Sequence, residues 1–190
     1  MANETWGGRR DGSGRKRLAP RALVPHRSRE SVERLLPVHV TLRMANTVYN
    51  LRSERSFNAL KRALRGAADR FGTRIIHFSV QGNHIHLIVE TPDRESLYRA
   101  MKGLSVRIAR RMNRMMNRKG QVIGSRYHTN VLRSHRATWN VLHYVRENHR
   151  KHFGKPGEWR TGISTDYFSS WAKPIPLPAP KTTYLRYAES

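Results

Sequence analysis

The chain has 190 residues, no cysteine and a formal net charge of +24. A chain of this length predicts one domain with extensions. Without cysteine it has no disulfides and no thiolate metal site, so any metal must bind nitrogen and oxygen ligands, which suits Mg²⁺ or Mn²⁺. The charge lies far outside ordinary globular composition and favours a polyanionic partner, with nucleic acid as the leading candidate.

A basic protein that binds a membrane surface is the competing interpretation of this charge. No apolar run in the sequence approaches the roughly 20 residues that span a bilayer, and no signal-peptide pattern opens the chain. We therefore expect no membrane partner and a cytoplasmic location.

Residues 1–36 are predicted to form a disordered basic arm, because glycines alternate with basic residues and apolar side chains are few. Arginines spaced by glycines can follow a phosphate track, so the arm is either a DNA tether or a solvated tail, and both interpretations stay open. The cations concerned are Arg9, Arg10, Arg15, Lys16 and Arg17.

The first regular elements are a strand and a helix. Val38 and Val40 alternate with polar residues, which predicts a half-buried strand over residues 37–44. Apolar residues then recur at helical spacing over residues 57–71, and Gly72 closes the run. We expect an amphipathic helix there.

Two further strands are predicted over residues 74–80 and 84–90, joined by the turn residues Gln81-Gly82-Asn83. Because side chains alternate along a strand, His84 and His86 project to one side while their apolar neighbours project to the other. Two neutral imidazoles side by side are a ready pair of ligands for a divalent cation. The alternative is a chance His-x-His pattern that binds no metal.

A long helix is predicted after Asp93, since apolar residues recur on one stripe from Leu97 to Met115. Basic residues occupy its other faces, and no Asp or Glu occurs from Ser96 through Arg146. A soluble surface usually mixes both signs, so this stretch indicates a phosphate-facing surface, with a solvated basic face as the alternative. The arginines of this region expected to contact DNA are Arg107, Arg110, Arg111, Arg114 and Arg118.

The last predicted elements of the domain are a strand and a helix. The strand covers residues 127–132, and Ser134 is a suitable N-cap for a helix from residue 135 to about residue 152. On this helix Tyr144 and Asn148 lie one turn apart on the same face. A helical tyrosine by itself is usually a core residue, so its role depends on its partners.

In chain order these elements read β-α-β-β-α-β with an added C-terminal helix. That order predicts an α+β, ferredoxin-like fold with an antiparallel sheet. It divides the chain into the arm over residues 1–36, the domain over residues 37–154 and a C-terminal extension over residues 155–190. The extension is too proline-rich for a regular element and is expected to wrap over the domain or its ligand.

Three stretches carry a family resemblance: His84-Ile85-His86 on a strand, the segment from Tyr144 to Asn148 on a later helix, and Arg126-Tyr127-His128 before the last strand. Together they resemble the HUH single-tyrosine transposases of small insertion sequences and the REP-associated tyrosine transposases. The resemblance covers about residues 37–152. The chain departs from the family pattern at His149, because members often have proline after the asparagine.

The resemblance implies an enzyme that nicks single-stranded or hairpin DNA and transfers the strand. His84, His86 and Asn148 would hold Mg²⁺ or Mn²⁺, and Tyr144 would attack the scissile phosphate, leaving a 5′-phosphotyrosine link. Because that link keeps the bond energy, strand transfer needs no nucleotide cofactor. The resemblance also implies a bacterial-type protein that acts at the nucleoid, as a monomer or a homodimer.

On this interpretation the basic helix and Arg126 would bind backbone phosphates, and Tyr127 would stack on unpaired bases. Two other interpretations stay open. One is a regulator that binds hairpin DNA or RNA with the same fold and without the reaction. The other is a basic structural protein such as a nucleoid-associated factor. Both predict that Tyr144→Phe leaves function intact.

Overall fold

The structure is a computed structural model that describes residues 31–32, 34–153, 166–172 and 175–189. The elements in chain order are β1 (Leu36–Arg43), α1 (Glu54–Arg65), β2 (Asp69–Arg70), β3 (Thr73–Val80), β4 (His84–Thr91), α2 (Arg94–Met115), β5 (His128–Val131), α3 (His135–Phe153), the short 3₁₀ helix η2 (Ser170–Ala172) and α4 (Thr183–Glu189). None of the helices in the described part of the chain is long and apolar enough to cross a membrane.

The strands form one antiparallel sheet in the order β2-β3-β4-β1-β5. Apart from the two-residue β2, the elements up to β5 follow the β-α-β-β-α-β order, and the predicted ferredoxin-like α+β fold is confirmed. β1 lies between β4 and β5 and pairs with β4 along its full length. This central position sets the polar side of β1 next to the histidines of β4.

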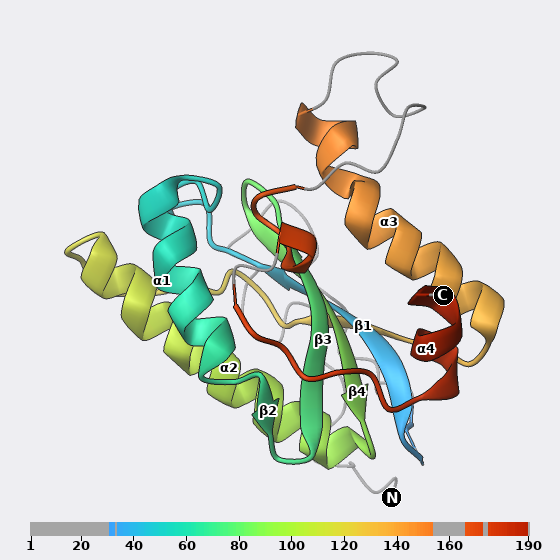
Figure 1. Ribbon diagram of the computed structural model, residues 1–190. Helices are drawn as coiled ribbons and strands as arrows, with labels where there is room; N and C mark the ends of the chain where they lie inside the picture. The colour runs from blue at the N-terminus through green and yellow to red at the C-terminus, as the bar shows by residue number, and fades with distance from the viewer. Residues whose placement is uncertain (1–30, 33, 154–165, 173–174, 190) are drawn as a thin grey trace, which may run out of the picture.

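Different helices cover the two faces of the sheet (Figure 1). α1 and α2 pack on one face, against alternate strand residues such as Val40 and Leu87. α3 and α4 lie on the other face, where Val145 of α3 packs with Ile88 of β4. Because side chains alternate along β4, its two histidines belong to the same face as Ile88 and lie on the α3 side.

The first helix is shorter than predicted. α1 begins at Glu54 and ends at Arg65, and does not reach residue 71. After Gly66 the chain forms β2, which pairs with β3 across Phe71 and Gly72. These two turn residues have positive φ angles of 56° and 73°, as in the tight hairpin turns whose twist matches that of paired strands. Apolar spacing alone could not separate this hairpin from a further helical turn.

The other boundaries lie close to those predicted. β1, β3, β4, β5 and α3 begin and end within one residue of their predicted limits. α2 starts earlier than its apolar stripe, because Asp93 caps it by accepting the backbone N–H of Ser96 at 2.7 Å. Ser134 caps α3 in the same way, accepting the backbone N–H of Ala137 at 3.1 Å.

The C-terminal segment is more regular than predicted. The expectation that it holds no regular element is wrong, because α4 forms after the last proline. Its described parts run along β3 and against α3 (Figure 1). The Asp166 carboxylate accepts two hydrogen bonds from Arg52, at 2.7 and 2.9 Å, and the backbone N–H of Val80 donates to the carbonyl of Phe168 at 2.9 Å. These contacts hold the segment on the domain.

A buried carboxylate anchors the start of α4 to β4. Glu90 is fully buried, and it accepts hydrogen bonds from Arg74 Nη1 at 3.1 Å, from the backbone N–H of Lys181 at 2.9 Å and from the backbone N–H of Thr182 at 2.6 Å. The donors satisfy a charge that would be costly to bury alone. The negative charge of the Glu90 carboxylate also lies at the N-terminus of α4, where the helix dipole favours it.

Glu90→Ala should lower the free energy of unfolding by about 3–5 kcal/mol, because it leaves the Arg74 guanidinium buried without its main partner. Urea denaturation followed by circular dichroism measures this loss. Asp69→Ala is the matched control, since Asp69 is an exposed carboxylate 3.7 Å from the same guanidinium and its loss should cost less than about 1 kcal/mol. Equal losses in the two variants would contradict the anchoring role of Glu90.

Candidate active site

A cluster of polar side chains lies on the α3 side of the sheet. β1 pairs with β4 so that Thr41 stands opposite His86 and Arg43 stands opposite His84. His84 Nε2 lies 3.1 Å from His86 Nε2. On the other edge of the His86 ring, Nδ1 lies 3.0 Å from His39 Nε2 and 3.3 Å from Thr41 Oγ1. His86 is therefore the centre of the cluster, and it is only 4% exposed.

The hydrogen-bond partners of the two β4 histidines indicate where their ring protons lie. Asn83 Oδ1 lies 2.9 Å from His84 Nδ1, and since an amide oxygen only accepts, Nδ1 carries the proton and Nε2 does not. Asn148 Nδ2 lies 3.0 Å from His86 Nε2, and in this orientation of the amide its N–H donates to an unprotonated Nε2. Two lone pairs then face each other at 3.1 Å. A cation between them would relieve the repulsion.

α3 brings Tyr144 and Asn148 to the histidines. The helix is seated on the sheet by Leu142 and Val145, which are buried with Ile88. Asn148 is 3% exposed and contacts His86. The ring of Tyr144 lies edge-on to His86 with a centroid distance of 5.5 Å, yet Tyr144 is 44% exposed. The four residues predicted to form the site thus come together, with the tyrosine on its open side.

The donor set of this site fits a divalent cation. Asn148 Oδ1 is buried and has no hydrogen-bond partner among the described residues. Its oxygen and nitrogen exchange places on a half-turn of the amide, so the oxygen can be presented to the space beside His84 and His86. Imidazole nitrogens with an amide oxygen are acceptable ligands for Mn²⁺ and Mg²⁺. No group of three or more His, Cys, Asp or Glu side chains gathers to hold a metal anywhere in the described ranges, so at this site the third ligand would have to be the Asn148 amide.

Sequence analysis did not identify His39 as a member of the site. Its ring lies edge to edge with that of His86, with a centroid distance of 5.1 Å and an interplanar angle of 26°. Burial lowers the pKa of His39 from its ordinary value to about 4, so the ring is neutral at neutral pH. The available signal was that His39 and Thr41 share the polar side of β1. Linking them to His86 required the strand register.

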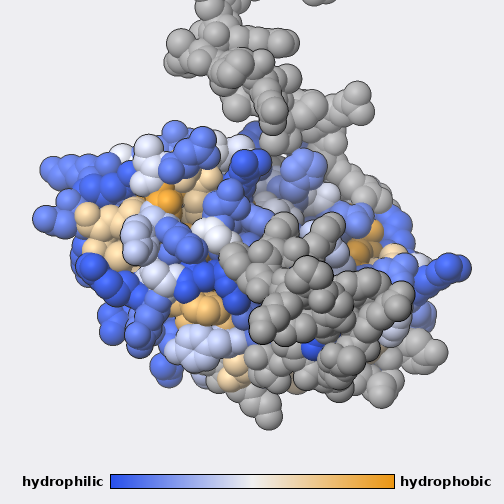
Figure 2. All heavy atoms as spheres, turned by 90° about the horizontal axis from the view of Figure 1, so that it is seen from above, coloured by the Kyte–Doolittle hydropathy of each residue, from blue (hydrophilic) through white to orange (hydrophobic). Residues whose placement is uncertain are grey.

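The arginines of α2 lie on the far side of the sheet from the histidines. α2 packs on the opposite face, together with α1 (Figure 1), so the sheet separates its basic surface from Tyr144. Viewed from above, hydrophilic side chains cover most of the visible described surface, with apolar patches between them (Figure 2). The α2 arginines concerned are Arg107 and Arg111, which are half-buried, and Arg110 and Arg114, which are exposed.

Arg118 differs from the other predicted DNA contacts because its guanidinium bonds to protein. It donates to the carbonyl of Thr47 at 2.9 Å, to the carbonyl of Gln121 at 2.6 Å and to Asn113 Oδ1 at 3.2 Å. These bonds tie the segment after α2 to the loop after β1. The structure therefore gives Arg118 a role in holding this end of the domain together.

Arg126 and Tyr127 also lie away from the histidine cluster. They line a depression with Tyr98 and Arg94 of α2 and Val131 of β5, on the α2 side of the sheet. Arg126 is exposed and Tyr127 is half-buried. The predicted arm cations, Arg9, Arg10, Arg15, Lys16 and Arg17, fall outside the described residues.

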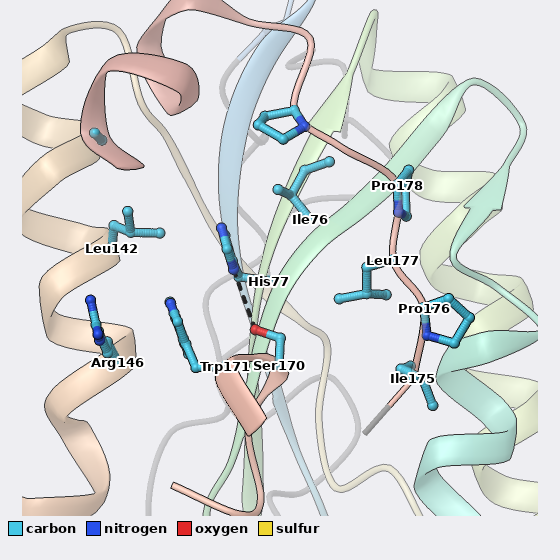
Figure 3. Close-up of a pocket in the computed structure, with 12 residues that line it drawn as sticks. Ile76, His77, Leu142, Arg146, Ser170, Trp171, Ile175, Pro176, Leu177 and Pro178 are labelled. Atoms are coloured by element: carbon cyan, nitrogen blue, oxygen red, sulfur yellow. Dashed lines mark hydrogen bonds between the residues drawn. The ribbon is translucent and has the colours of Figure 1, made fainter. Parts of the chain in front are cut away.

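A cavity of about 750 Å³ lies between β3, α3 and the C-terminal segment (Figure 3). Its lining is mainly apolar. Three of the side chains in it contact one another: His77 Nδ1 lies 3.3 Å from Ser170 Oγ, and the His77 ring stacks on Trp171 at 4.8 Å. Neither His84 nor His86 lines this space, so the cavity is separate from the histidine cluster.

Comparison with known proteins identifies the family and supports the fold. Residues 34–148 match the family described as "Transposase IS200 like". Among solved structures, a REP-associated tyrosine transposase bound to a REP hairpin matches with a TM-score of 0.62 and 14% identity, over 79% of this chain and 84% of that chain. A candidate transposase from Deinococcus radiodurans R1 matches with a TM-score of 0.45 and 21% identity, over 60% of this chain and 90% of that one.

No curated protein matches the chain. The structural likeness at this level of identity supports the fold. The family match spans more than half of the 190 residues and includes His84, His86, Tyr144 and Asn148. The chain therefore belongs to the IS200-like transposase family.

Proposed function

We propose that this transposase cuts and rejoins single-stranded DNA at hairpins through a 5′-phosphotyrosine intermediate and depends on a divalent metal. The observation that carries the proposal is the pair of Nε2 atoms of His84 and His86, 3.1 Å apart, with Asn148 and Tyr144 against them. Membership of the IS200-like family and the likeness to a relative bound to a REP hairpin support hairpin DNA as the substrate.

In this proposal His84 and His86 would hold Mg²⁺ or Mn²⁺ through Nε2, and Asn148 would hold it through Oδ1 after a half-turn of its amide. When bound there, the cation supplies positive charge that polarises the scissile phosphate. The protein prepares the ligands in advance, because Asn83 holds the His84 proton on Nδ1 and burial keeps Asn148 and His86 in place.

Tyr144 supplies the nucleophile. Its hydroxyl oxygen bonds to phosphorus as the bond from phosphorus to the 3′-oxygen breaks, which leaves a 5′-phosphotyrosine and a free 3′-hydroxyl. The 44% exposure of Tyr144 gives a DNA strand access to the ring and lets the phenolic proton pass to solvent. An incoming 3′-hydroxyl reverses the step and joins strands without a nucleotide cofactor.

The tyrosine of this proposal acts in cis. Tyr144 and Asn148 both contact His86 of the same chain. α3 itself is packed on its own sheet through Leu142 and Val145. One chain can therefore supply every residue of the proposed site, and we expect a monomer to carry out the reaction.

The α2 arginines contribute to DNA binding on the face opposite to Tyr144. Arg110 and Arg114 are exposed and four residues apart, so they lie side by side on α2. The sheet separates them from the scissile phosphate. They therefore add affinity for flanking phosphates and take no part in the chemistry.

The variant Arg110→Ala/Arg114→Ala should bind a hairpin more weakly and with a shallower salt dependence. Each lost phosphate contact reduces the slope of log K against log salt by about 0.7–0.9. Fluorescence anisotropy at several salt concentrations measures the slope. The variant Arg110→Lys/Arg114→Lys keeps both charges and should keep the slope. An unchanged slope in the alanine variant would show that this face does not contact DNA.

The experiment that tests the proposed function uses labelled hairpin DNA drawn from the sequence flanking the gene. The protein is incubated with it in Mn²⁺, Mg²⁺ or EDTA, and the products are separated by denaturing electrophoresis. We expect a protein–DNA adduct that survives denaturation and forms only with metal. Tight binding without an adduct in either metal would instead identify a regulator that keeps the fold without the reaction.

A further inference from the structure

We propose that His39 is a positioning residue of the metal site: by accepting a hydrogen bond from His86 Nδ1–H, it holds His86 in the tautomer whose Nε2 is unprotonated. The inference rests on the metal site of the proposed function. It adds a residue to that site on the evidence of the hydrogen bonds around His86.

The geometry places His39 on the side of His86 that faces away from the proposed metal. The two nitrogens that meet are His39 Nε2 and His86 Nδ1, at 3.0 Å, while His86 Nε2 is directed at His84 and Asn148. The two rings meet edge to edge with their centroids 5.1 Å apart, and the contact restricts rotation of the His86 imidazole. His39 therefore controls both the orientation of the ring and the position of its proton.

Counting protons on His86 gives the direction of the hydrogen bond. A neutral imidazole carries one ring proton. In the proposed metal site His86 Nε2 keeps its lone pair for the cation, so the proton is on Nδ1 and is donated to His39 Nε2, with Thr41 Oγ1 as a more distant acceptor at 3.3 Å. Without these acceptors the proton is better placed on Nε2, where it would point at His84 and occupy the side needed for the cation.

His84 does not need an equally specific partner. Asn83, which fixes the tautomer of His84, is exposed, and water can take its place as an acceptor. His86 is 4% exposed, so the acceptor for its Nδ1–H must come from the protein. Loss of an outer hydrogen-bond partner of a metal ligand typically weakens metal binding by about 10–100-fold. We expect His39 to have an effect of this size through His86.

The test uses the full chain as wild type, His39→Leu and His39→Gln. Long-range ¹H–¹⁵N NMR of the histidine rings reports the His86 tautomer in metal-free protein, and calorimetry with MnCl₂ reports metal affinity. We expect wild-type His86 to be protonated on Nδ1. In His39→Leu the Nε2–H form should appear and Mn²⁺ affinity should fall about 10–100-fold. Glutamine offers an oxygen acceptor at a similar reach and should restore both readouts.

His77→Leu is the matched control, because His77 lies on the same face of the sheet and contacts Ser170 and Trp171, away from the site (Figure 3). It should leave the His86 tautomer and the Mn²⁺ affinity unchanged. A wild-type His86 protonated on Nε2 would overturn the inference without any variant. So would a Mn²⁺ affinity that falls no further in His39→Leu than in His77→Leu.

Failure of this inference is distinguishable from failure of the proposed function. If wild-type protein does not bind Mn²⁺, the metal dependence of the proposed function fails, while the tautomer measurement still decides whether His39 positions His86. If wild type binds Mn²⁺ and His39→Leu binds it equally well, the metal site stands and only the role of His39 is refuted.

Discussion

Replacing Tyr144 with phenylalanine should abolish the covalent protein–DNA adduct while hairpin binding is kept. The substitution removes one oxygen and leaves the ring beside His86, where the centroids lie 5.5 Å apart. Removing a catalytic nucleophile typically costs a factor of at least about a thousand in rate. Adduct formation on labelled hairpin DNA in Mn²⁺, followed by denaturing electrophoresis, measures the loss, and anisotropy on the same DNA measures binding.

Tyr98→Phe is the control for this experiment. Tyr98 has the same 44% exposure as Tyr144, but it belongs to α2, on the other side of the sheet. It should form adduct at the wild-type rate. Adduct formation by Tyr144→Phe at a rate near that of wild type would mean that another residue attacks the DNA.

Replacing His86 with alanine should remove Mn²⁺ binding and adduct formation together. His86 is the residue that joins His84, Asn148 and Tyr144 in one site. The loss of Mn²⁺ affinity should exceed the roughly 10–100-fold decrease seen when only an outer partner of a metal ligand is removed. Calorimetry measures binding, and the adduct assay with and without EDTA measures metal dependence.

His77→Ala serves as the control, since it shortens another histidine on the same sheet face, whose ring contacts Ser170 and Trp171. Thermal unfolding of both variants separates loss of the site from loss of the fold. If His86→Ala bound Mn²⁺ with wild-type affinity, or formed adduct in EDTA, the assignment of the metal site to the histidine pair would be wrong.

The ferredoxin-like fold could be predicted because its elements have clear periodicities. Alternation in β1 and β4 and the apolar stripe of α2 each specify one element type, and their order leaves few topologies. The hairpin at Phe71 and Gly72 was missed because its short strand, Asp69–Arg70, lies between Ala68 and Phe71, which continue the apolar helical spacing. α4 was missed because its start depends on Glu90, a residue far away in the sequence.

The core of the candidate site followed from local spacing. Residues two apart on a strand and four apart on a helix share a face, so His84 with His86 and Tyr144 with Asn148 could each be paired from the sequence. That the two pairs meet depends on how Leu142 and Val145 seat α3 on the sheet. The spacing within each pair does not encode that packing.

Two features of the site required the tertiary structure. His39 reaches His86 only through the register of β1 and β4. The sequence of α2 could not show on which side of the sheet the helix lies. Its apolar stripe shows which of its residues are buried, and not which face of the sheet they are buried against. Right-handed crossovers between parallel strands do place the two crossover helices, α1 and α2, on one face of the sheet. That rule was the signal that the α2 arginines would lie opposite to the site.

The most direct measurement is mass spectrometry of the protein–DNA adduct after digestion with nuclease and trypsin. Cleavage after Arg136 and Arg146 releases residues 137–146, a peptide in which Tyr144 is the only tyrosine. We predict that this peptide carries the nucleotide through its tyrosine and that the modification is absent when EDTA replaces Mn²⁺. A nucleotide attached to any other residue, or an unmodified peptide in protein that has cut its DNA, would contradict the tyrosine mechanism.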